Sequence, residues 1–415
     1  MDKSLKQGYK VVFAGFGMNL AFGVLYAWSI FSKQLIDQYH WNSAQATMPY
    51  TIAIAIFAMA MIPAGKLQDK VGARKIGTLG GALTGTGLIL ASFFTTPLGL
   101  SLSFGLLCGM GIGLGYASAT PVAIKWFPSE KKGIITGIVV SGFGLSTLYM
   151  APLANYLTQT FTMFGAFRIL GVSFIFIVMG LAQFLVAPKL SPDAAPLVKT
   201  TPKTSMPSDS QHQYKWQEMI KTPIFYIIWF IFLCGALGGL MIIGHLSKIT
   251  ALQSGQNFGF ILVAFTALFN ASGRPIAGFV SDKFGRFKTL SILFAVASIT
   301  FFNFNHLTHF GTLLIGAAIV TFSYGSLFAI MPSLISDYFG KLHLGVNYGI
   351  LFSAWGIGGV AGPMLASRIA DQTGNYLASF RLAGTLGLAA CLCSLTTHVI
   401  IMRKKASPQV EEMLS

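Results

Sequence analysis

The sequence has little charge and very little acid. Asp, Glu, Lys and Arg together make up 10% of its 415 residues, well below the roughly 25% of a soluble globular chain. Only 12 residues are acidic, against 28 Lys and Arg, and the four cysteines all lie within apolar runs. The composition excludes a water-soluble enzyme, and the cysteines predict neither a disulfide framework nor a metal site. We expect no cofactor and no metal.

Long apolar runs are abundant instead. Hydrophobic residues make up 54% of the chain, and the mean hydropathy is +0.68. Runs of about 20 residues recur throughout, and each can cross a hydrocarbon core of about 30 Å as a helix. The first run is too long for the apolar core of a cleaved signal peptide, so we expect it to be retained. The predicted helices lie near residues 9–31, 44–65, 76–94, 98–124, 132–157, 165–187, 222–250, 257–280, 288–304, 309–338, 344–370 and 378–402. The sequence therefore predicts an all-α membrane protein with twelve transmembrane helices.

The basic residues fall mainly on one side of these helices. With both termini placed in the cytoplasm, 22 of the 28 Lys and Arg lie inside, five lie outside, and Arg274 lies within the membrane. This bias follows the positive-inside rule. It predicts a multi-pass protein of the inner membrane of a bacterial-type cell, with both termini cytoplasmic. The cations form no continuous stripe, so nucleic acid is not an expected partner, and we expect a monomer in the lipid bilayer.

A proline-rich stretch divides the chain. Residues 188–221 carry five prolines among Ser, Thr and Lys with almost no apolar clustering, which is typical of a flexible linker. The predicted domains are an N-terminal six-helix bundle at residues 1–187, a cytoplasmic linker at 188–221, and a C-terminal six-helix bundle at 222–415.

The two predicted bundles share two sequence echoes. The loop from Gly65 to Lys75 recurs 213 residues later as the loop from Gly278 to Lys288, each time between the second and third helix of its half. In a second echo, displaced by 208 to 212 residues, Tyr116, Phe127, Gly133, Gly137 and Pro152 correspond to Tyr324, Phe339, Gly345, Gly349 and Pro363. Parallel repeats of six helices, with a binding site between them at mid-depth, are an architecture of secondary transporters.

The loop from Gly65 to Lys75 matches the loop motif of the major facilitator superfamily nearly in full, and the chain resembles that superfamily over all twelve helices. Residues 23–31, 125–128 and 239–245 resemble the oxalate/formate antiporter family, which is related to the monocarboxylate transporters. The resemblance implies two pseudo-symmetric six-helix bundles and secondary active transport by alternating access, with a small carboxylate anion as substrate.

The loop motif has an expected role in gating. Asp69 can meet the positive end of a neighbouring helix and pair with Arg74. Asp282, the counterpart of Asp69, and Arg286 are the gating candidates of the second copy. In the superfamily this element is thought to hold the outward-facing state, and Gly65 lets the opposing helix approach. The alternative is a solvated, positive-inside loop without a gating role.

Arg274 is the single ionised side chain deep in an apolar segment. It lies eight residues before Asp282, about 12 Å along a helix and close to the bilayer midplane. A cation there costs at least about 2.5 kcal/mol, so such residues are interpreted as substrate or ion sites by default. The planar guanidinium suits a carboxylate, and Asn270 shares its helix face. A structural ion pair is the alternative, but all twelve Asp and Glu fall in loops, termini or helix ends. The hypothesis requires a guanidinium that neither faces lipid nor is saturated by backbone oxygens.

The resemblance also bears on the substrate. Members that carry the oxalate dianion pair this Arg with a Lys in the eleventh helix, where this chain has Trp355. One cation balances one negative charge, so we predict a monocarboxylate of lactate, pyruvate or formate size. The indole N–H of Trp355 can donate to one substrate oxygen. An oxalate or dicarboxylate:formate antiporter and a membrane substrate sensor remain alternatives, and an enzyme is not expected.

Aromatic residues complete the candidate site. Tyr116 and Trp355 lie near mid-depth by helical rise, and the repeat adds Tyr324 as the counterpart of Tyr116. The resemblance adds Tyr26 and Tyr149 toward the outer gate. Asn19 and Tyr348 are weaker candidates. The alternative for each aromatic side chain is ordinary packing.

His245 is a candidate for proton coupling. It lies with Lys248 near the outer end of the seventh helix and could take up an external proton. A hydrated histidine at the membrane edge, beside a Lys that extends to the interface, is the alternative. Both proton-coupled symport and anion exchange therefore remain open.

Overall fold

The computed structural model describes residues 3–188, 212–256 and 259–414, so most of the predicted linker at 188–221 lies outside the described residues. Nearly all of the described chain is helical, and it contains no strand. The N-terminal elements are α1 (Lys3–Phe22), η1 (Gly23–Ala27), α2 (Trp28–Tyr39), α3 (Ser43–Val71), α4 (Ala73–Ala91), α5 (Pro97–Leu100), η2 (Ser101–Cys108), α6 (Gly109–Ile124), η3 (Ser129–Lys131) and α7 (Lys132–Ala182). The C-terminal elements are α8 (Trp216–Met219), α9 (Pro223–Ile243), α10 (Leu246–Ser254), α11 (Gly259–Phe284), α12 (Arg286–Asn303), η4 (Phe304–His306), α13 (Phe310–Phe339), α14 (Leu344–Thr373) and α15 (Leu377–Leu414).

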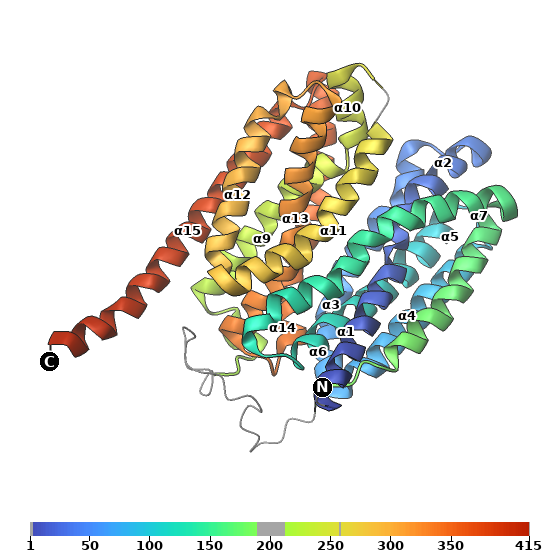
Figure 1. The fold of residues 1–415 in the computed structure, drawn as a ribbon. Coiled ribbons are helices and arrows are strands. Elements are labelled where there is room, and N and C mark those ends of the chain that lie inside the picture. Colours follow the sequence, from blue (N-terminus) through green and yellow to red (C-terminus); the bar gives the residue numbers. More distant parts are fainter. Residues whose placement is uncertain (1–2, 189–211, 257–258, 415) are drawn as a thin grey trace.

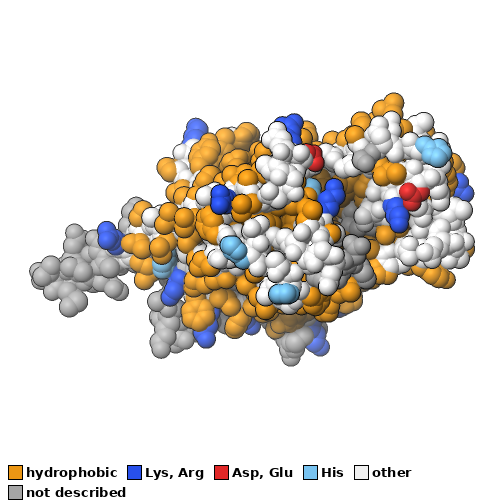
Figure 2. All heavy atoms as spheres, turned by 90° about the horizontal axis from the view of Figure 1, so that it is seen from above, with side chains coloured by type: hydrophobic (Ala, Val, Ile, Leu, Met, Phe, Trp, Pro, Cys, Tyr) orange, Lys and Arg blue, Asp and Glu red, His pale blue; other side chains and the backbone are white. Residues whose placement is uncertain are grey.

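Ten helical segments of the described chain are long and apolar enough to cross a membrane. One of them, α7, contains 51 residues and two membrane-length parts that meet at Thr162, the one residue inside it with non-helical angles. The glycine- and threonine-rich α4 is not among the ten but has 19 residues. Counting both parts of α7 and adding α4 gives the twelve predicted helices. Figure 2 looks onto one end of the molecule, where areas of hydrophobic side chains lie beside polar side chains and backbone, with Lys, Arg, His, Asp and Glu side chains scattered among them.

The helices form two bundles that lie side by side (Figure 1). The main contacts between the bundles are made by α3 with α14 and by α7 with α11. We call the end of the molecule that carries the N-terminus and residues 125–131, 212–222 and 340–343 the linker end, and the opposite end the far end. The ribbons of the two bundles meet toward the linker end and diverge toward α2 and α10 (Figure 1).

The first sequence echo adopts the same backbone conformation in both bundles. Gly72 separates α3 from α4 with φ +94°, and Gly285 separates α11 from α12 with φ +96°. L-residues with a side chain rarely adopt such angles. The equal geometry at equal positions agrees with the pseudo-symmetry that the sequence predicts.

The two echoes contact each other across the bundle interface. A Cβ on Gly65 of α3 would collide with the backbone of Gly345 at the start of α14, and a Cβ on Gly278 of α11 would collide with the backbone of Gly133 at the start of α7. Each pair joins the first echo of one bundle to the second echo of the other. The expectation that Gly65 lets an opposing helix approach is confirmed.

One predicted helix boundary is confirmed and one is wrong. The predicted break between residues 157 and 165 contains Thr162, where non-helical angles (φ 66°, ψ 170°) divide α7 into two helices. The predicted helix at 222–250 is interrupted, because α9 ends at Ile243 and α10 begins at Leu246. Hydropathy does not detect this interruption, since the apolar run continues through it.

Replacing Gly278 tests the close helix crossing. We expect Gly278→Ala to cost about 1–3 kcal/mol, as overpacking does, because neither backbone can yield to the added methyl group. Hydrogen–deuterium exchange should then be faster at the first amides of α7. Gly180→Ala, on α7 with no neighbouring atom within 4 Å of the added carbon, is the matched control. Unchanged exchange in Gly278→Ala would contradict the crossing.

Candidate functional site

Arg274 lies on α11 and is among the largest fully buried side chains, with 1% of its surface exposed. Its guanidinium reaches into the other bundle, where Nη1 donates to the carbonyl oxygen of Val140 on α7. Nη2 donates to Oδ1 of Asn270 at 3.3 Å, and the Nε–H has no partner. The guanidinium carbon lies 4.7 Å from the centroid of the Phe328 ring. The group therefore neither faces lipid nor is saturated by backbone oxygens.

The charge of Arg274 has no acidic partner in the described part of the chain. The ion pairs of the described residues all lie at the linker end and involve other cations. Two neutral oxygens and an aromatic face stabilise the guanidinium instead. A buried cation surrounded in this way gains from a charged acceptor, so the arrangement suits an anion.

Small residues on α7 allow Arg274 to reach across. A Cβ on Gly144 would stand 3.3 Å from the guanidinium carbon, and a Cβ on Gly137 would collide with the backbone of Arg274 and Pro275. Each glycine thus removes a side chain that would separate the two helices. The local sequence of α7 positions an arginine that belongs to the other bundle.

Three predicted aromatic residues meet in one cluster that spans both bundles. Phe352 of α14 lies at its centre, with ring centroids 5.6 Å from Tyr116 of α6 and 4.8 Å from Trp355 of α14. The indole N–H of Trp355 donates to the Tyr324 hydroxyl of α13 at 2.8 Å. The predicted donor to a substrate oxygen is therefore already engaged with a protein group. Phe328 connects this aromatic cluster to Arg274, since its ring lies 6.2 Å from that of Trp355.

Tyr26 and Tyr149 have different surroundings. Tyr26, on η1, lies within electrostatic reach of Arg274 and packs edge-on against Phe143 at 5.4 Å. Tyr149 is 38% exposed, and its hydroxyl donates to the carbonyl of Leu20 at 2.8 Å, which ties α7 to α1. No described contact brings Tyr149 to the guanidinium.

The two weaker candidates are both fully buried. The Asn19 amide nitrogen donates to the carbonyls of Gly15 and Val139, each at 3.0 Å, while its Oδ1 has no partner. Tyr348 and Tyr116 lie within reach of each other's hydroxyl groups, although neither makes a well-formed hydrogen bond. Asn19 therefore lies beside the helix segment that binds Arg274, and Tyr348 extends the aromatic cluster.

His245 lies in the break between α9 and α10, at the far end. One ring nitrogen lies 3.0 Å from the carbonyl oxygen of Pro363, and the other lies 3.3 Å from the Tyr376 hydroxyl. Burial lowers the pKa of the imidazole below its ordinary value, and the bond to Pro363 opposes this shift. These contacts tie the break to α14 and to the start of α15, and none of them involves Arg274.

Asp69 lies at the first contact between the bundles at the linker end. Its Oδ2 accepts from the backbone N–H of Val346, in the first turn of α14, at 3.3 Å. A carboxylate at a helix N-terminus is stabilised by the helix dipole, as predicted. The predicted partner Arg74 is wrong, however: Arg74 is exposed, and Asp69 lies 3.7 Å from the ammonium group of Lys125.

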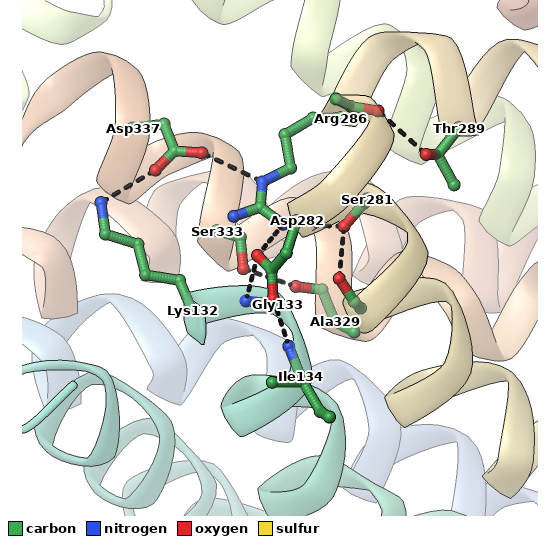
Figure 3. A network of polar contacts seen from close by, with 12 residues as sticks. Lys132, Gly133, Ile134, Ser281, Asp282, Arg286, Thr289, Ala329, Ser333 and Asp337 are labelled. Atoms are coloured by element: carbon green, nitrogen blue, oxygen red, sulfur yellow. Dashed lines mark hydrogen bonds and ion pairs between the residues drawn. The ribbon is translucent and has the colours of Figure 1, made fainter. Parts of the chain in front are cut away.

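Asp282 makes the matching contact with α7 (Figure 3). Its carboxylate accepts from the backbone N–H groups of Gly133 and Ile134, both at 2.9 Å, and pairs with Arg286 at 2.6 Å. Arg286 also pairs with Asp337 at 3.0 Å, and Lys132 pairs with Asp337 at 2.8 Å. This network closes the linker end between α7, α11 and α13.

Sequence reasoning missed several of these groups. Val140 contributes only a carbonyl oxygen, which no residue pattern identifies. Lys132 and Asp337 lie at helix ends, where their charge resembles that of a solvated loop. Phe328 is one of 36 phenylalanines and carries no distinguishing sequence signal.

A family model described as Major Facilitator Superfamily matches residues 11–302 and 245–412. The chain belongs to this superfamily. It is 28% identical to the Oxalate:formate antiporter of Oxalobacter formigenes over 394 residues, covering 93% of this chain and 90% of that protein. It is 26% identical to Monocarboxylate transporter 13 of Rattus norvegicus over 396 residues, covering 92% of this chain and 87% of that one.

Solved structures of transporters share the fold. The chain superposes on the superfamily transporter FucP in the outward conformation with a TM-score of 0.66 and 14% identity, over 93% of this chain and 99% of that one. It superposes on the human organic anion transporter MFSD10 with a TM-score of 0.68 and 14% identity, over 95% and 100%. The protein is therefore a multi-pass membrane transporter of the major facilitator fold.

Lys341 adds a titratable contact between the bundles of this transporter. Its ammonium group donates to the carbonyl of Phe127 at 3.3 Å. Burial and, to a smaller extent, nearby Lys132 lower the pKa of Lys341 to about 8, against the opposing effect of Asp337 and Glu130. The closed linker end therefore holds this proton less tightly than a state in which Lys341 is solvated.

We expect alkaline pH to favour the closed linker end. Solvated Lys341 has an ordinary pKa of 10.5, so raising the pH from 7 to 9 should shift the equilibrium toward the closed state by about tenfold. Hydrogen–deuterium exchange at residues 344–348, corrected for its intrinsic pH dependence, measures the shift. Lys341→Arg stays charged and Lys341→Gln stays neutral over this range, so both should lose the effect. The same pH dependence in all three proteins would contradict the assignment to Lys341.

Proposed function

We propose that this transporter carries a small monocarboxylate, of lactate, pyruvate or formate size, by alternating access, and that Arg274 binds its carboxylate. The observation that carries the proposal is a fully buried guanidinium between the bundles that has neutral acceptors, a free Nε–H and no acidic partner in the described chain. A carboxylate supplies the missing charge and fits the planar donor group.

Charge balance supports a monocarboxylate. Desolvating a second carboxylate without a matching cation costs several kcal/mol. Trp355, which stands where the resemblance places the Lys of oxalate carriers, is 6% exposed and packed among aromatic rings. Lys125 and Lys132 pair with acids at the linker end.

The proposed orientation places the linker end in the cytoplasm of a bacterial-type cell, with both termini inside, in agreement with the positive-inside bias. In that orientation, the contacts of Asp69 and Asp282 close the cytoplasmic side, and the structure corresponds to an outward-facing state. Asp69, Asp282 and Arg286 are the proposed gating residues, and the position of Arg74 supports no gating role for it.

Exchange of one anion for another is the coupling mode that we favour. His245 contacts Pro363 and Tyr376 at the far end, and no described contact links it to Arg274. Exchange requires no proton relay, whereas symport would require one between these two residues. Labelled lactate that enters preloaded liposomes without a pH gradient would support exchange, and uptake that requires a pH gradient would support symport and a role for His245. Counterflow of either kind would exclude a substrate sensor.

Arg274→Lys tests the carboxylate site. Lysine keeps the charge but loses the planar donor pair, and a hydrogen bond to a charged group contributes about 1.5–3 kcal/mol, so we expect lactate uptake into proteoliposomes to fall by about 10- to 150-fold. Arg168→Lys is the matched control, because Arg168 bonds Ser92 and lies over Phe93 within one bundle. Unchanged uptake by Arg274→Lys would refute the assignment.

Trp355→Lys tests the charge argument. A second cation next to Phe328 would match a dianion, so we expect oxalate to compete with labelled lactate at least about tenfold better than in the wild type, because the mismatch of several kcal/mol is relieved. Trp355→Leu removes the indole without adding charge and should show no such gain. Oxalate uptake by the wild type at a rate comparable to lactate would favour the oxalate:formate exchanger instead.

A further inference from the structure

An extended segment, residues 212–215, crosses the linker end of the C-terminal bundle. We call this segment the strap. The Tyr214 backbone N–H donates to the carbonyl of Phe339 at 3.1 Å, and the side-chain amide of Asn347 donates to the carbonyl of Tyr214 at 3.0 Å. The Tyr214 ring also packs edge-on against Phe339 at 5.5 Å. The strap thus bridges the end of α13 and the first turn of α14.

Gln213 holds the turn between these two helices. Its Oε1 accepts from the backbone N–H of Leu342 at 3.0 Å. Gly340, at the end of α13, has φ +87°, and a Cβ there would collide with the Gln213 side chain. The turn therefore requires a glycine for its backbone angle and for the space that Gln213 fills.

The far side of the strap is fixed to α8. The backbone N–H of Lys215 donates to Glu218 at 2.9 Å, and the His212 ring lies 3.3 Å from the same carboxylate. The His212 ring also packs edge-on against Tyr214, with centroids 4.6 Å apart. The strap is thus held at both ends.

The turn that the strap holds is also a contact with the N-terminal bundle. Lys341 within it donates to the carbonyl of Phe127, and Val346, one residue before Asn347, donates to Asp69. The first turn of α14 is therefore bonded to Asp69 through one residue and to the strap through the next. Any shift of that turn changes both bonds.

Two contacts close the linker end, that of Asp69 with α14 (the Asp69 gate) and that of Asp282 with α7 (the Asp282 gate), and they differ in the ion pairs that support them. At α7, Asp282 pairs with Arg286 at 2.6 Å, and the Lys132–Asp337 pair lies beside it. At α14, the ion pair that Asp69 makes with Lys125 is longer, at 3.7 Å. The weaker electrostatic support occurs where the strap is present.

We propose that the strap positions the Asp69 gate: Gln213 and Tyr214 hold the α13–α14 turn where Val346 meets Asp69 and Lys341 meets Phe127. The inference rests on the proposed alternating access, since it assigns the strap to the closed state of one gate. Loosening the strap weakens that state without altering Arg274 or the aromatic cluster.

Gln213→Ala is the test variant, because Gln213 is exposed and its loss leaves the helices intact. Hydrogen–deuterium exchange of the purified full-length protein, without substrate, should be about three- to tenfold faster at residues 344–348 and at the end of α3, as expected for the loss of one neutral hydrogen bond. Gln213→Glu keeps an acceptor for Leu342 and should restore slow exchange.

Gln183→Ala is the matched control, because exposed Gln183 at the same end bonds Thr78 within one bundle. It should leave exchange at both segments unchanged. Faster exchange in Gln213→Ala that is confined to residues 340–343, or failure of Gln213→Glu to restore slow exchange, would overturn the proposal. Because no substrate is present, a wrong substrate assignment does not affect the result.

Discussion

The close crossing of two helix pairs is the constraint on which the rest of this structure depends. Gly65 against Gly345 and Gly278 against Gly133 bring backbones into direct contact. A side chain at these positions would separate the helices and remove the acids from the helix N-termini that they bind. Because each pair joins opposite bundles, the contact that forms the closed end must also break when the bundles rock. Close packing and reversibility therefore have the same origin, since small residues contribute little apolar area to hold the helices together.

The distribution of charge follows from the same geometry. Asp69 and Asp282 lie at the linker end, where backbone N–H groups and basic side chains surround them, whereas the guanidinium of Arg274 lies inside with oxygen atoms of neutral groups. Ion pairs stabilise the closed end, while the Arg274 guanidinium has no acidic partner among the described residues. A buried unmatched charge is costly, which is why the interior and not the closed end is suited to bind an anion.

Much of the fold was predictable because it is repeated. The two echoes predicted the two bundles, and the structure shows the same positive φ at Gly72 and Gly285 in both. The sequence also predicted that Asp69 meets the start of a neighbouring helix, although it did not identify that helix as α14. The basic partner of Asp69 could not be predicted. Lys125 approaches from the end of a different helix, and Arg74, although near in sequence, is exposed. The burial of Arg274 could be predicted from hydropathy. Its bond to Val140 could not, because every residue has a backbone carbonyl and the sequence does not show which one the guanidinium meets. Trp355 was expected to face a substrate, but its N–H meets Tyr324, and only the relative placement of α13 and α14 decides this.

The site and the closed end are coupled through one helix crossing. On α7, Gly137 contacts the backbone of Arg274, and Gly133, one turn earlier, contacts Gly278, one turn beyond Arg274 on α11. The guanidinium of Arg274 donates to the carbonyl of Val140, which adds a side-chain bond across this crossing. Under the proposed function, a carboxylate offers a charged acceptor that is stronger than the neutral carbonyl, so the cation no longer depends on α7. The loaded protein then loses one restraint on opening that the empty protein keeps. Under the same proposal, a carrier with this property would exchange anions more readily than it returns without one, in agreement with the exchange that we propose.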